Sequence, residues 1–495
     1  MRLKIRSISL ALLGIAFSLG LLHHKAAAQV VSGLGWSEPL NLSESFTSSS
    51  SPVIVADDFG FVHVFWSEDL DGVPHDGAIA PGAGNSILYR RLADGLWTDA
   101  IDLAYGGATK ILHSPSAAAS DDGYLHLVWI ENYTLQYSYA PVWNAQRVKA
   151  WSPPVELVQG QIGRVRLLNL GDRLLCIYTI LFGRDAGLYA ISFNQASSDN
   201  PLAVWFGPTG FAPQDIGAAL DGKGRVHVVW SIVQPPSPAA LEVQYAYSED
   251  GGSTWTNSRV VATQTSAIDG LQFAVPWVAA RGDDEIHLQW AQGEQAYRWH
   301  QYSTNGGKNW SDPYQIWPDL ISQTNSQATA TDADNNLYWS DVLRYPNGMY
   351  LIRWGGNAWQ APEFYFDIEH AILGSPESRI NSHALRMAIS RGIELHVVFQ
   401  DQDKAEIWYM SRTLTSSEIA TQPVPTQTPL PRVTPATGLL PATEMPLVTP
   451  LEASISGPST EVDNLMSSPG IITLLGVIPV ALLVSILVFT SVKKK

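Results

Sequence analysis

Two short sequence patterns alternate along this chain, each in seven copies. The first is a turn followed by a strand that ends in a large aromatic residue, as in DDFGFVHVFW; its central positions are His63, His126, Cys176, His227, His287, Tyr338 and His396. The second starts with tryptophan, as in WSEPLNL, and its copies begin at Trp36, Trp97, Trp151, Trp205, Trp255, Trp310 and Trp359. Successive tryptophans lie 61, 54, 54, 50, 55 and 49 residues apart. A period of about fifty residues with four short strands per unit predicts a β-propeller.

The two series start and end out of phase, which predicts how the ring closes. The chain opens on the tryptophan pattern at Trp36 and ends on the turn-strand unit at His396. We therefore expect the strand at Trp36 to pair with Glu406 to Arg412 and to complete the last blade, so that no sheet edge stays open. The fold class is all-β with seven blades; a six-bladed ring with one unit outside is the alternative, because Cys176 and Trp205 lie in weakened copies.

The first unit shows the expected order of strands within a blade. Alternating apolar residues and Gly- or Asp-rich turns place strand A at 51–57, strand B at 61–66, strand C at 87–92 and strand D from Trp97 onward. The central histidine of strand B recurs in five of the seven units. Because a catalytic histidine is needed only once, this repetition predicts a structural hydrogen bond in each blade.

Composition and charge exclude some classes of function. Charged residues make up 15% of the chain and its formal net charge is −16, without basic stripes. Nucleic-acid binding depends on clustered Lys and Arg, so we expect no nucleic-acid partner. The chain has one cysteine, Cys176, which allows no internal disulfide and is predicted to be an inert buried thiol.

Both ends of the chain have the composition of targeting segments. Residues 1–28 combine a basic start, an apolar run and the small residues Ala26 to Ala28, which predicts a secretory signal peptide; an uncleaved anchor is the alternative. Residues 469–492 include an uncharged apolar stretch of the length that a transmembrane helix needs, and the lysines at 493–495 predict a cytoplasmic tail.

The remaining chain divides into an ectodomain and a stalk. Residues 29–415 form the predicted propeller, and residues 416–468 are rich in Pro, Thr, Ser and Ala. Such a segment cannot bury enough apolar surface to fold, so we expect a disordered stalk. The sequence thus predicts a single-pass protein of the cell membrane whose propeller is extracellular.

Two turns between strands C and D carry a family resemblance. The segment SEDGGSTW contains Ser248, Asp250, Gly252 and Trp255, and STNGGKNW contains Ser303, Asn305, Gly307 and Trp310. Both resemble the Asp-box (BNR repeat) of sialidase-like propellers, and the resemblance extends over about Val30 to Thr415. In this motif the Asp or Asn side chain accepts backbone hydrogen bonds, the glycines take left-handed conformations and the tryptophan packs the hairpin onto the blade. We therefore expect these residues to be structural.

The resemblance also implies a catalytic set against which the sequence can be compared. Sialidases clamp a substrate carboxylate with three arginines and use a Tyr–Glu nucleophile pair and an acidic acid/base residue. Where the first arginine is expected, this chain has Ser49 to Ile54, without arginine. The weak catalytic candidates that remain are Arg164, Arg184, Arg344, Tyr345, Arg379 and Asp341.

Loops added to a rigid scaffold are where binding residues tend to lie. Candidates for ligand binding in the loops are Glu68, Asp69, Asp71, Asp76, Lys110 and Asp401. The insertion at 67–86 combines acidic residues with Gly and Pro. Two interpretations remain: Asp69, Asp71 and Asp76 hold a cation such as calcium, or the insertion is a flexible surface loop. No metal site and no cofactor is otherwise predicted.

Two classes of function remain. The first is a non-catalytic, membrane-anchored propeller that binds an extracellular protein or glycan through its loop-rich face. The second is an extracellular exo-sialidase-type glycoside hydrolase with a diverged active site. The missing arginine and the acidic ectodomain favour the first, since like charges weaken the association with an anionic sialoside.

Overall fold

The computed structural model describes residues 35–45, 47–70, 85–237, 239–264, 271, 274–293, 296–316, 327–344, 347–366, 385–401 and 405–425. The predicted signal peptide, the transmembrane segment and the cytoplasmic lysines lie outside these residues and stay predictions. None of the helices found in the described ranges is long and apolar enough to cross a membrane. The chain divides into two compact units, residues 1–426 and 427–495, and the propeller belongs to the first of them.

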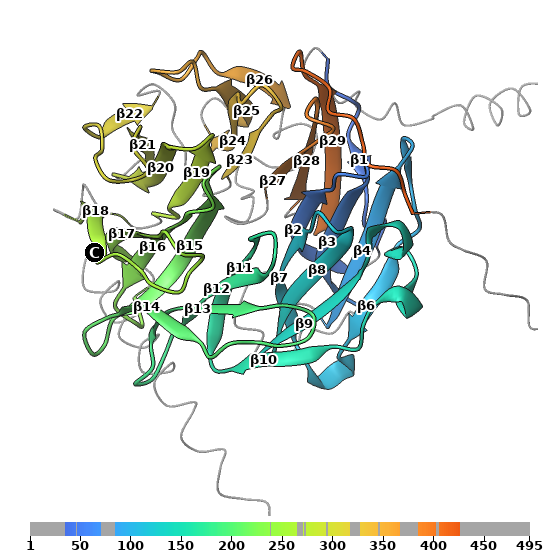
Figure 1. The fold of residues 1–495 in the computed structure, drawn as a ribbon, viewed down its shortest axis with the longest axis horizontal. Coiled ribbons are helices and arrows are strands. Elements are labelled where there is room, and N and C mark those ends of the chain that lie inside the picture. Colours follow the sequence, from blue (N-terminus) through green and yellow to red (C-terminus); the bar gives the residue numbers. More distant parts are fainter. Residues whose placement is uncertain are drawn as a thin grey trace, which may run out of the picture. The chain divides into compact units, whose positions relative to one another are not determined.

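Seven antiparallel sheets form the blades of a ring (Figure 1). Blade one contains β2 (Ser48–Ala56), β3 (Val62–Asp69), β4 (Ser86–Ala93), β5 (Leu96–Trp97) and β6 (Ile101–Tyr105). Blade two contains β7 (Leu112–Ala119), β8 (Tyr124–Glu131), β9 (Thr134–Pro141) and β10 (Val155–Gln159). Blade three contains β11 (Ile162–Asn169), β12 (Leu174–Ile180), β13 (Gly187–Phe193) and β14 (Leu202–Phe206).

The second half of the ring repeats this order. Blade four contains β15 (Ala212–Leu220), β16 (Val226–Val233), β17 (Ala240–Ser248) and β18 (Arg259–Thr263). Blade five contains β19 (Trp277–Arg281), β20 (Glu285–Gln292), β21 (Tyr297–Ser303) and β22 (Tyr314–Ile316). Blade six contains β23 (Gln327–Thr331), β24 (Leu337–Arg344), β25 (Asn347–Arg353) and β26 (Glu363–Phe366). Blade seven contains β27 (Arg386–Ser390), β28 (Glu394–Asp401), β29 (Glu406–Thr413) and β1 (Leu40–Asn41).

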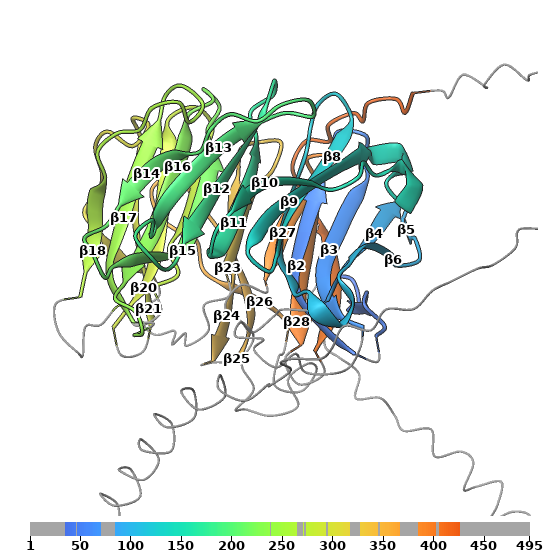
Figure 2. The same ribbon diagram turned by 90° about the horizontal axis from the view of Figure 1, so that it is seen from below.

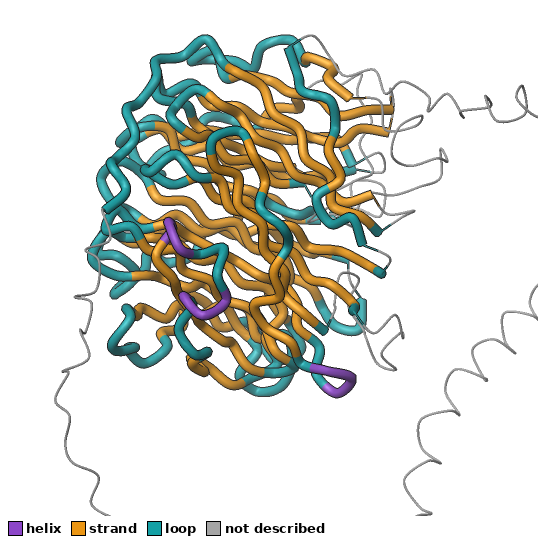
Figure 3. The backbone as a smooth tube through the Cα atoms, turned by 90° about the vertical axis from the view of Figure 1, so that its right-hand side faces the viewer, coloured by secondary structure: helices purple, strands orange, loops and turns teal. Residues whose placement is uncertain are grey.

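The prediction of seven blades is confirmed, and the six-bladed alternative is wrong. The weakened third unit still forms a complete four-stranded sheet, β11 to β14. The first strand of each blade contacts the first strand of the next, and β2 contacts β27, so the ring closes. Apart from strands and loops, the described residues contain three short 3-10 helices, Gly107–Thr109, Val142–Asn144 and Val148–Ala150 (Figure 3).

The predicted closure by the N-terminal strand is also confirmed. In β1, Leu40 pairs with Tyr409 and Asn41 with Trp408, both on β29. Trp36 forms a bridge to Arg412, and its ring stacks on Tyr365 of blade six at 4.2 Å. The first and last segments of the propeller therefore share one sheet, as the phase of the two sequence patterns predicts.

Strand alternation gives the ring two different ends (Figure 2). We call the end with the turns between the first and second strands, and between the third and fourth, the turn face. The opposite end, with the loops between the second and third strands and the connections between blades, is the loop face. The 248–255 and 303–310 turns lie on the turn face because they follow the third strands, β17 and β21.

The recurrent histidine of the second strand forms the structural hydrogen bonds that its repetition predicts. His63 contacts the hydroxyl of Tyr89 at 2.7 Å and the carboxylate of Asp57 at 3.0 Å. His227 is bonded to Tyr245 at 2.7 Å and to Asp221 at 3.1 Å in the same way. The equivalent bonds in blades two, five and seven pair His126 with Tyr137, His287 with His300, and His396 with Tyr409. Each bond ties the second strand to the third, in a buried environment.

Candidate functional site

Three arginines from two blades meet at the centre of the ring. Arg164 and Arg166 lie on β11, and Arg386 is the first residue of β27. Arg164 lies where the pairing of β11 with β12 shifts register, between Ile162 and Val165, and its charge acts on both Arg166 and Arg386. We call Arg164, Arg166 and Arg386 the central arginine cluster.

Trp277 of β19 joins the cluster across the ring. The guanidinium of Arg166 lies 5.8 Å from the centre of this indole ring, and that of Arg386 lies 5.9 Å from it. Because β11, β19 and β27 belong to blades three, five and seven, these contacts cross the centre rather than join neighbouring blades. Arginine over an indole is a favourable cation–π arrangement.

The position of Trp277 is fixed by its neighbours. Its indole nitrogen donates a hydrogen bond of 2.8 Å to the hydroxyl of Thr329 on β23. On the other side, a Cβ on Gly217 would lie 3.1 Å from the Cα of Trp277, so glycine at this position favours the close approach of β15 and β19. The indole is therefore held in one orientation between its two arginine partners.

Positive charge exceeds negative charge in this cluster. Arg164 Nε lies 3.7 Å from a carboxylate oxygen of Asp215. In the described part of the chain, Arg166 and Arg386 form no ion pair; each donates instead to the carbonyl of its preceding residue, at 2.8 and 2.7 Å. Among the residues that the structure describes, Asp215 is thus the one carboxylate paired with these three guanidinium groups.

Burial and repulsion between the guanidinium groups lower the pKa values of Arg166 and Arg386. Burial and, to a smaller extent, the charge of Arg164 lower the pKa of Arg166 to about 10. The pKa of Arg386 is also well below its ordinary value, because of burial and then the charges of Arg166 and Arg164. Arginine side chains in proteins keep their proton at neutral pH, so the cluster is cationic. Burial lowers the pKa of the nearby His113 to about 4, with Arg164 adding to the effect, so this imidazole is neutral.

These charges favour an anion at the centre of the ring. A carboxylate, sulfate or phosphate group would relieve the repulsion between the guanidinium groups and accept their planar hydrogen bonds. The side chain of Arg164 is 29% exposed, whereas Arg166 and Arg386 are partly buried. Arg164 and Arg386 lie near the starts of their strands, which is the end of the ring that carries the loop face.

Of the predicted catalytic candidates, Arg164 belongs to this cluster. Arg184 lies in the exposed loop between β12 and β13. Asp341 is buried and accepts bonds of 2.5 and 3.0 Å from Arg298, so it joins blades five and six; burial raises its pKa to about 6 although Arg298 opposes the shift. The side chain of Arg344 and the whole of Tyr345 and Arg379 lie outside the described residues.

The predicted ligand-binding residues do not gather into one group. Glu68 is fully buried, and its carboxylate accepts hydrogen bonds from Ser45, Thr47, Ser49 and Trp66. Lys110 pairs with Glu131. Asp69 and Asp401 end β3 and β28, and Asp71 and Asp76 lie outside the described residues. Among the residues that are described, no three acidic, His or Cys side chains are placed to hold a metal ion.

The two glycine-rich turns have nearly the same internal hydrogen bonds. In the first, the Ser248 hydroxyl donates to Asp250 at 2.8 Å, and Asp250 accepts the Thr254 amide at 2.8 Å. In the second, Ser303 donates to Asn305 at 3.0 Å. The tryptophan that follows donates to a glycine carbonyl in both turns, Trp255 at 3.1 Å and Trp310 at 2.9 Å. The predicted structural residues therefore act together within each turn.

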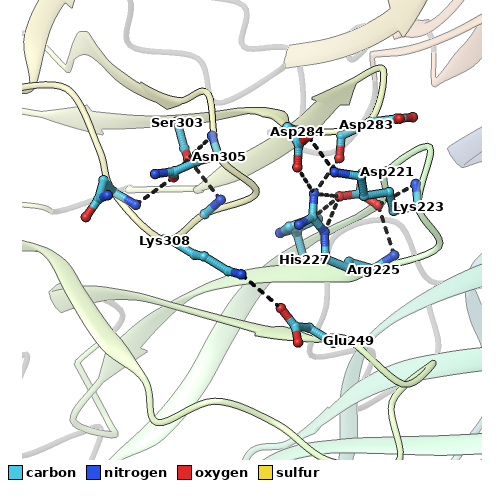
Figure 4. Close-up of polar contacts among 12 residues, drawn as sticks. Asp221, Lys223, Arg225, His227, Glu249, Asp283, Asp284, Ser303, Asn305 and Lys308 are labelled. Atoms are coloured by element: carbon cyan, nitrogen blue, oxygen red, sulfur yellow. Dashed lines mark hydrogen bonds and ion pairs between the residues drawn. The ribbon is translucent and has the colours of Figure 1, made fainter.

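These turns also connect neighbouring blades. Figure 4 shows the 303–310 turn beside the charged residues of blades four and five. The Gly306 amide donates to the Asp284 carbonyl at 2.8 Å, and Arg225 of blade four pairs with Asp284 of blade five at 2.8 Å. Lys308 reaches Glu249 of blade four at 3.6 Å. The turn therefore fastens its blade to the preceding one, in addition to closing its own hairpin.

No family model and no curated protein matches the chain. Several solved structures are similar in fold. A protein of unknown function from Dyadobacter fermentans is 13% identical with a TM-score of 0.49, over 77% of this chain and 100% of that one. A leech intramolecular trans-sialidase is 11% identical with a TM-score of 0.42, over 76% and 70%. A Penicillium chrysogenum α-L-arabinanase is 11% identical with a TM-score of 0.43, over 77% and 99%. The seven-bladed fold itself is established by the strand pairing of this chain.

Proposed function

We propose that this propeller is a non-catalytic binding module that receives an anionic group of an extracellular glycan or protein at the centre of its loop face. The observation that carries the proposal is the central arginine cluster around Trp277, with one neighbouring carboxylate, Asp215. Arginine recognises planar anions with two parallel hydrogen bonds, and Trp277 packs against two of the three arginines. The ligand class is a saccharide or peptide that carries a carboxylate, sulfate or phosphate.

A sialidase-type hydrolase is the second candidate, and the number of arginines favours it. Three arginines are what the resemblance implies, but here two come from β11 and one from β27. Hydrolysis also needs a carboxylic acid and a nucleophile at the sugar. Among the described residues, Asp215 lies beside Arg164 and Asp341 is engaged by Arg298. We therefore favour binding without turnover.

The predicted targeting segments of the chain support an extracellular location for this module. The signal peptide 1–28 directs export, and the segment 469–492 anchors the protein in the membrane through the stalk. The two Asp-box-like turns, with their serine, acidic or amide residue and tryptophan, support the relation to sialidase-like propellers. We propose no cofactor for this binding, and chelation with EDTA tests whether calcium at 69–76 contributes.

A glycan and peptide array probed with the detergent-solubilised full chain tests this function. We expect retained ligands to carry an anionic group, and Arg386→Gln to abolish their retention. Arg184→Gln is the matched control, because Arg184 is exposed and lies outside the cluster. Retention of neutral ligands that Arg386→Gln leaves unchanged would contradict the proposal. Hydrolysis of a fluorogenic sialoside that Arg386→Gln abolishes would favour the hydrolase.

A further inference from the structure

The chain continues along the turn face after the last strand of the propeller. We call residues 414–425, which follow β29, the C-terminal strap. The strap begins beyond the third strand of blade seven and passes the first turns of three blades. This course extends ten residues past the predicted end of the propeller at 415.

Backbone hydrogen bonds attach the strap to blade seven. The Leu414 amide donates to the Ile393 carbonyl at 2.7 Å, and the Ile419 amide donates to the Arg391 carbonyl at 2.8 Å. Between them, the Ser416 hydroxyl donates to the Gly392 carbonyl at 3.0 Å. These bonds occupy the turn that joins β27 to β28.

The strap also reaches the blades on either side. The Ser417 amide donates to the carboxylate of Asp334, in the first turn of blade six, at 3.1 Å. At the other end, the Gln422 amide donates to the carbonyl of Asp58, in the first turn of blade one, at 2.7 Å. One segment therefore bridges blades six, seven and one.

Glycines in two of these turns leave room for the strap. Gly392 has a φ of +72°, and a Cβ there would lie 3.0 Å from the Ser417 carbonyl oxygen. Gly60 of blade one has a φ of +87°, and a Cβ there would lie 2.8 Å from Cγ2 of Thr421. Glycine thus satisfies both a left-handed backbone and a close approach of the strap.

The strap lies across the junction between the last blade, blade seven, and the first. Blade seven combines both ends of the propeller, and its N-terminal strand β1 has only two residues, Leu40–Asn41. We infer that the C-terminal strap is a second clasp of the ring, which ties the last blade to the first independently of β1. Ile419 is 55% exposed, so backbone hydrogen bonds rather than apolar burial hold the strap.

The strap and the central arginine cluster lie at opposite ends of the ring. The strap follows the third strand of blade seven along the turn face, whereas Arg164 and Arg386 lie toward the loop face. The clasp therefore does not depend on the proposed function.

Paired glycine substitutions in the full chain test the clasp. Gly60→Ala places a methyl group against Thr421, whereas Gly224→Ala is made in the corresponding turn of blade four, at φ +78° with nothing within 4 Å. Both variants carry the same backbone strain. We expect Gly60→Ala to lower Tm more than Gly224→Ala, and Thr421→Ser, which lacks Cγ2, to remove the difference.

Hydrogen exchange gives the second readout. In the unmodified chain we expect slow exchange at the amides of Ile419 and Gln422, and Gly60→Ala should speed exchange at Gln422 by at least about tenfold while Leu414 is unchanged. Equal Tm values for Gly60→Ala and Gly224→Ala would overturn the inference. So would exchange at Gln422 at the rate of an unfolded peptide in the unmodified chain. Neither readout depends on ligand binding.

Discussion

The indole of Trp310 in blade five packs edge-on against the ring of Tyr245 in blade four, with centroids 5.0 Å apart at 78°. The guanidinium of Arg259 lies 4.8 Å from the same indole. A residue of the glycine-rich turn thus belongs to the contact between two blades. Tyr245 is also hydrogen-bonded to His227. Tyr245 therefore contacts both Trp310 of the turn and the repeated histidine of its own blade.

Removal of this indole should destabilise the whole ring. We expect Trp310→Ala to lower the free energy of unfolding by about 3 kcal/mol, the lower end for a large aromatic residue because Trp310 is only half-buried. Trp310→Phe, which keeps part of the contact, should lose less. Urea denaturation measures both, and a fully stable Trp310→Ala variant that loses ligand binding would show that the residue is functional instead.

The hydroxyl of Tyr245 should contribute through its bond to His227. Tyr245→Phe leaves a buried imidazole nitrogen without its partner, which should cost about 1–3 kcal/mol. Tyr189→Phe is the control, because that hydroxyl donates to the Asp185 carbonyl at an exposed site. Chemical denaturation should separate the two variants; equal losses would contradict a specific role for the buried bond.

The buried carboxylate of Glu68 should be structural. Glu68→Gln replaces an acceptor by an amide that must face the hydroxyl and indole donors around it, and we expect a loss of about 1–3 kcal/mol in denaturant unfolding. Glu44→Gln, at a side chain that is 63% exposed, should be neutral. A stable Glu68→Gln variant with impaired ligand binding would instead support the sequence-based hypothesis that this residue binds ligand.

Buried histidines should make the propeller less stable in mild acid. Burial lowers the folded-state pKa of His126 and of His396 to about 4, from an ordinary value of 6.5. Between these values only the unfolded state binds the proton, so stability present above pH 6.5 is lost as pH falls toward 4. The pKa of Asp102 and Asp341, raised to about 6, opposes this trend.

The magnitude of the acid effect follows from the pKa shifts. One pKa unit corresponds to about 1.4 kcal/mol, so each of the two histidines contributes on the order of 3 kcal/mol. Because His63, His227 and His287 shift in the same direction, we expect a net fall in Tm from pH 7 to pH 4.5. Thermal unfolding across this range measures it, and a Tm that rises on acidification would contradict the assignment.

The architecture could be predicted because the two sequence patterns repeat once in each blade. The phase of the two patterns predicted the pairing of Trp36 with the last blade, and the recurrence of histidine predicted a bond in each blade. The tryptophan pattern was less exact about strands: Trp255 and Trp310 lie in turns before β18 and β22, whereas Trp205 lies inside β14. The weak third unit was still a blade, because Cys176 fills its position as an apolar residue between Leu175 and Ile177.

The candidate site was only partly predictable. Arg164 was recognised as a charged residue near a loop, but Arg166, Arg386 and Trp277 were missed because they lie within strands and meet across the ring. Two arginines in IGRVRLLN were the available signal, because charged residues are unusual in the innermost strand of a blade. Which blades face each other there depends on tertiary structure.

Equilibrium binding of one matched ligand pair tests the central claim most directly. The pair is the best anionic ligand retained on the array and the same molecule with its carboxylate reduced to an alcohol, or its sulfate or phosphate removed. We expect the unmodified protein and Arg184→Gln to bind the charged form at least about tenfold more tightly, and Arg386→Gln to lose that preference, as removal of one charged hydrogen-bonding partner implies. Equal affinity of the unmodified protein for both forms, or an unchanged preference in Arg386→Gln, would contradict anion binding by the central arginine cluster.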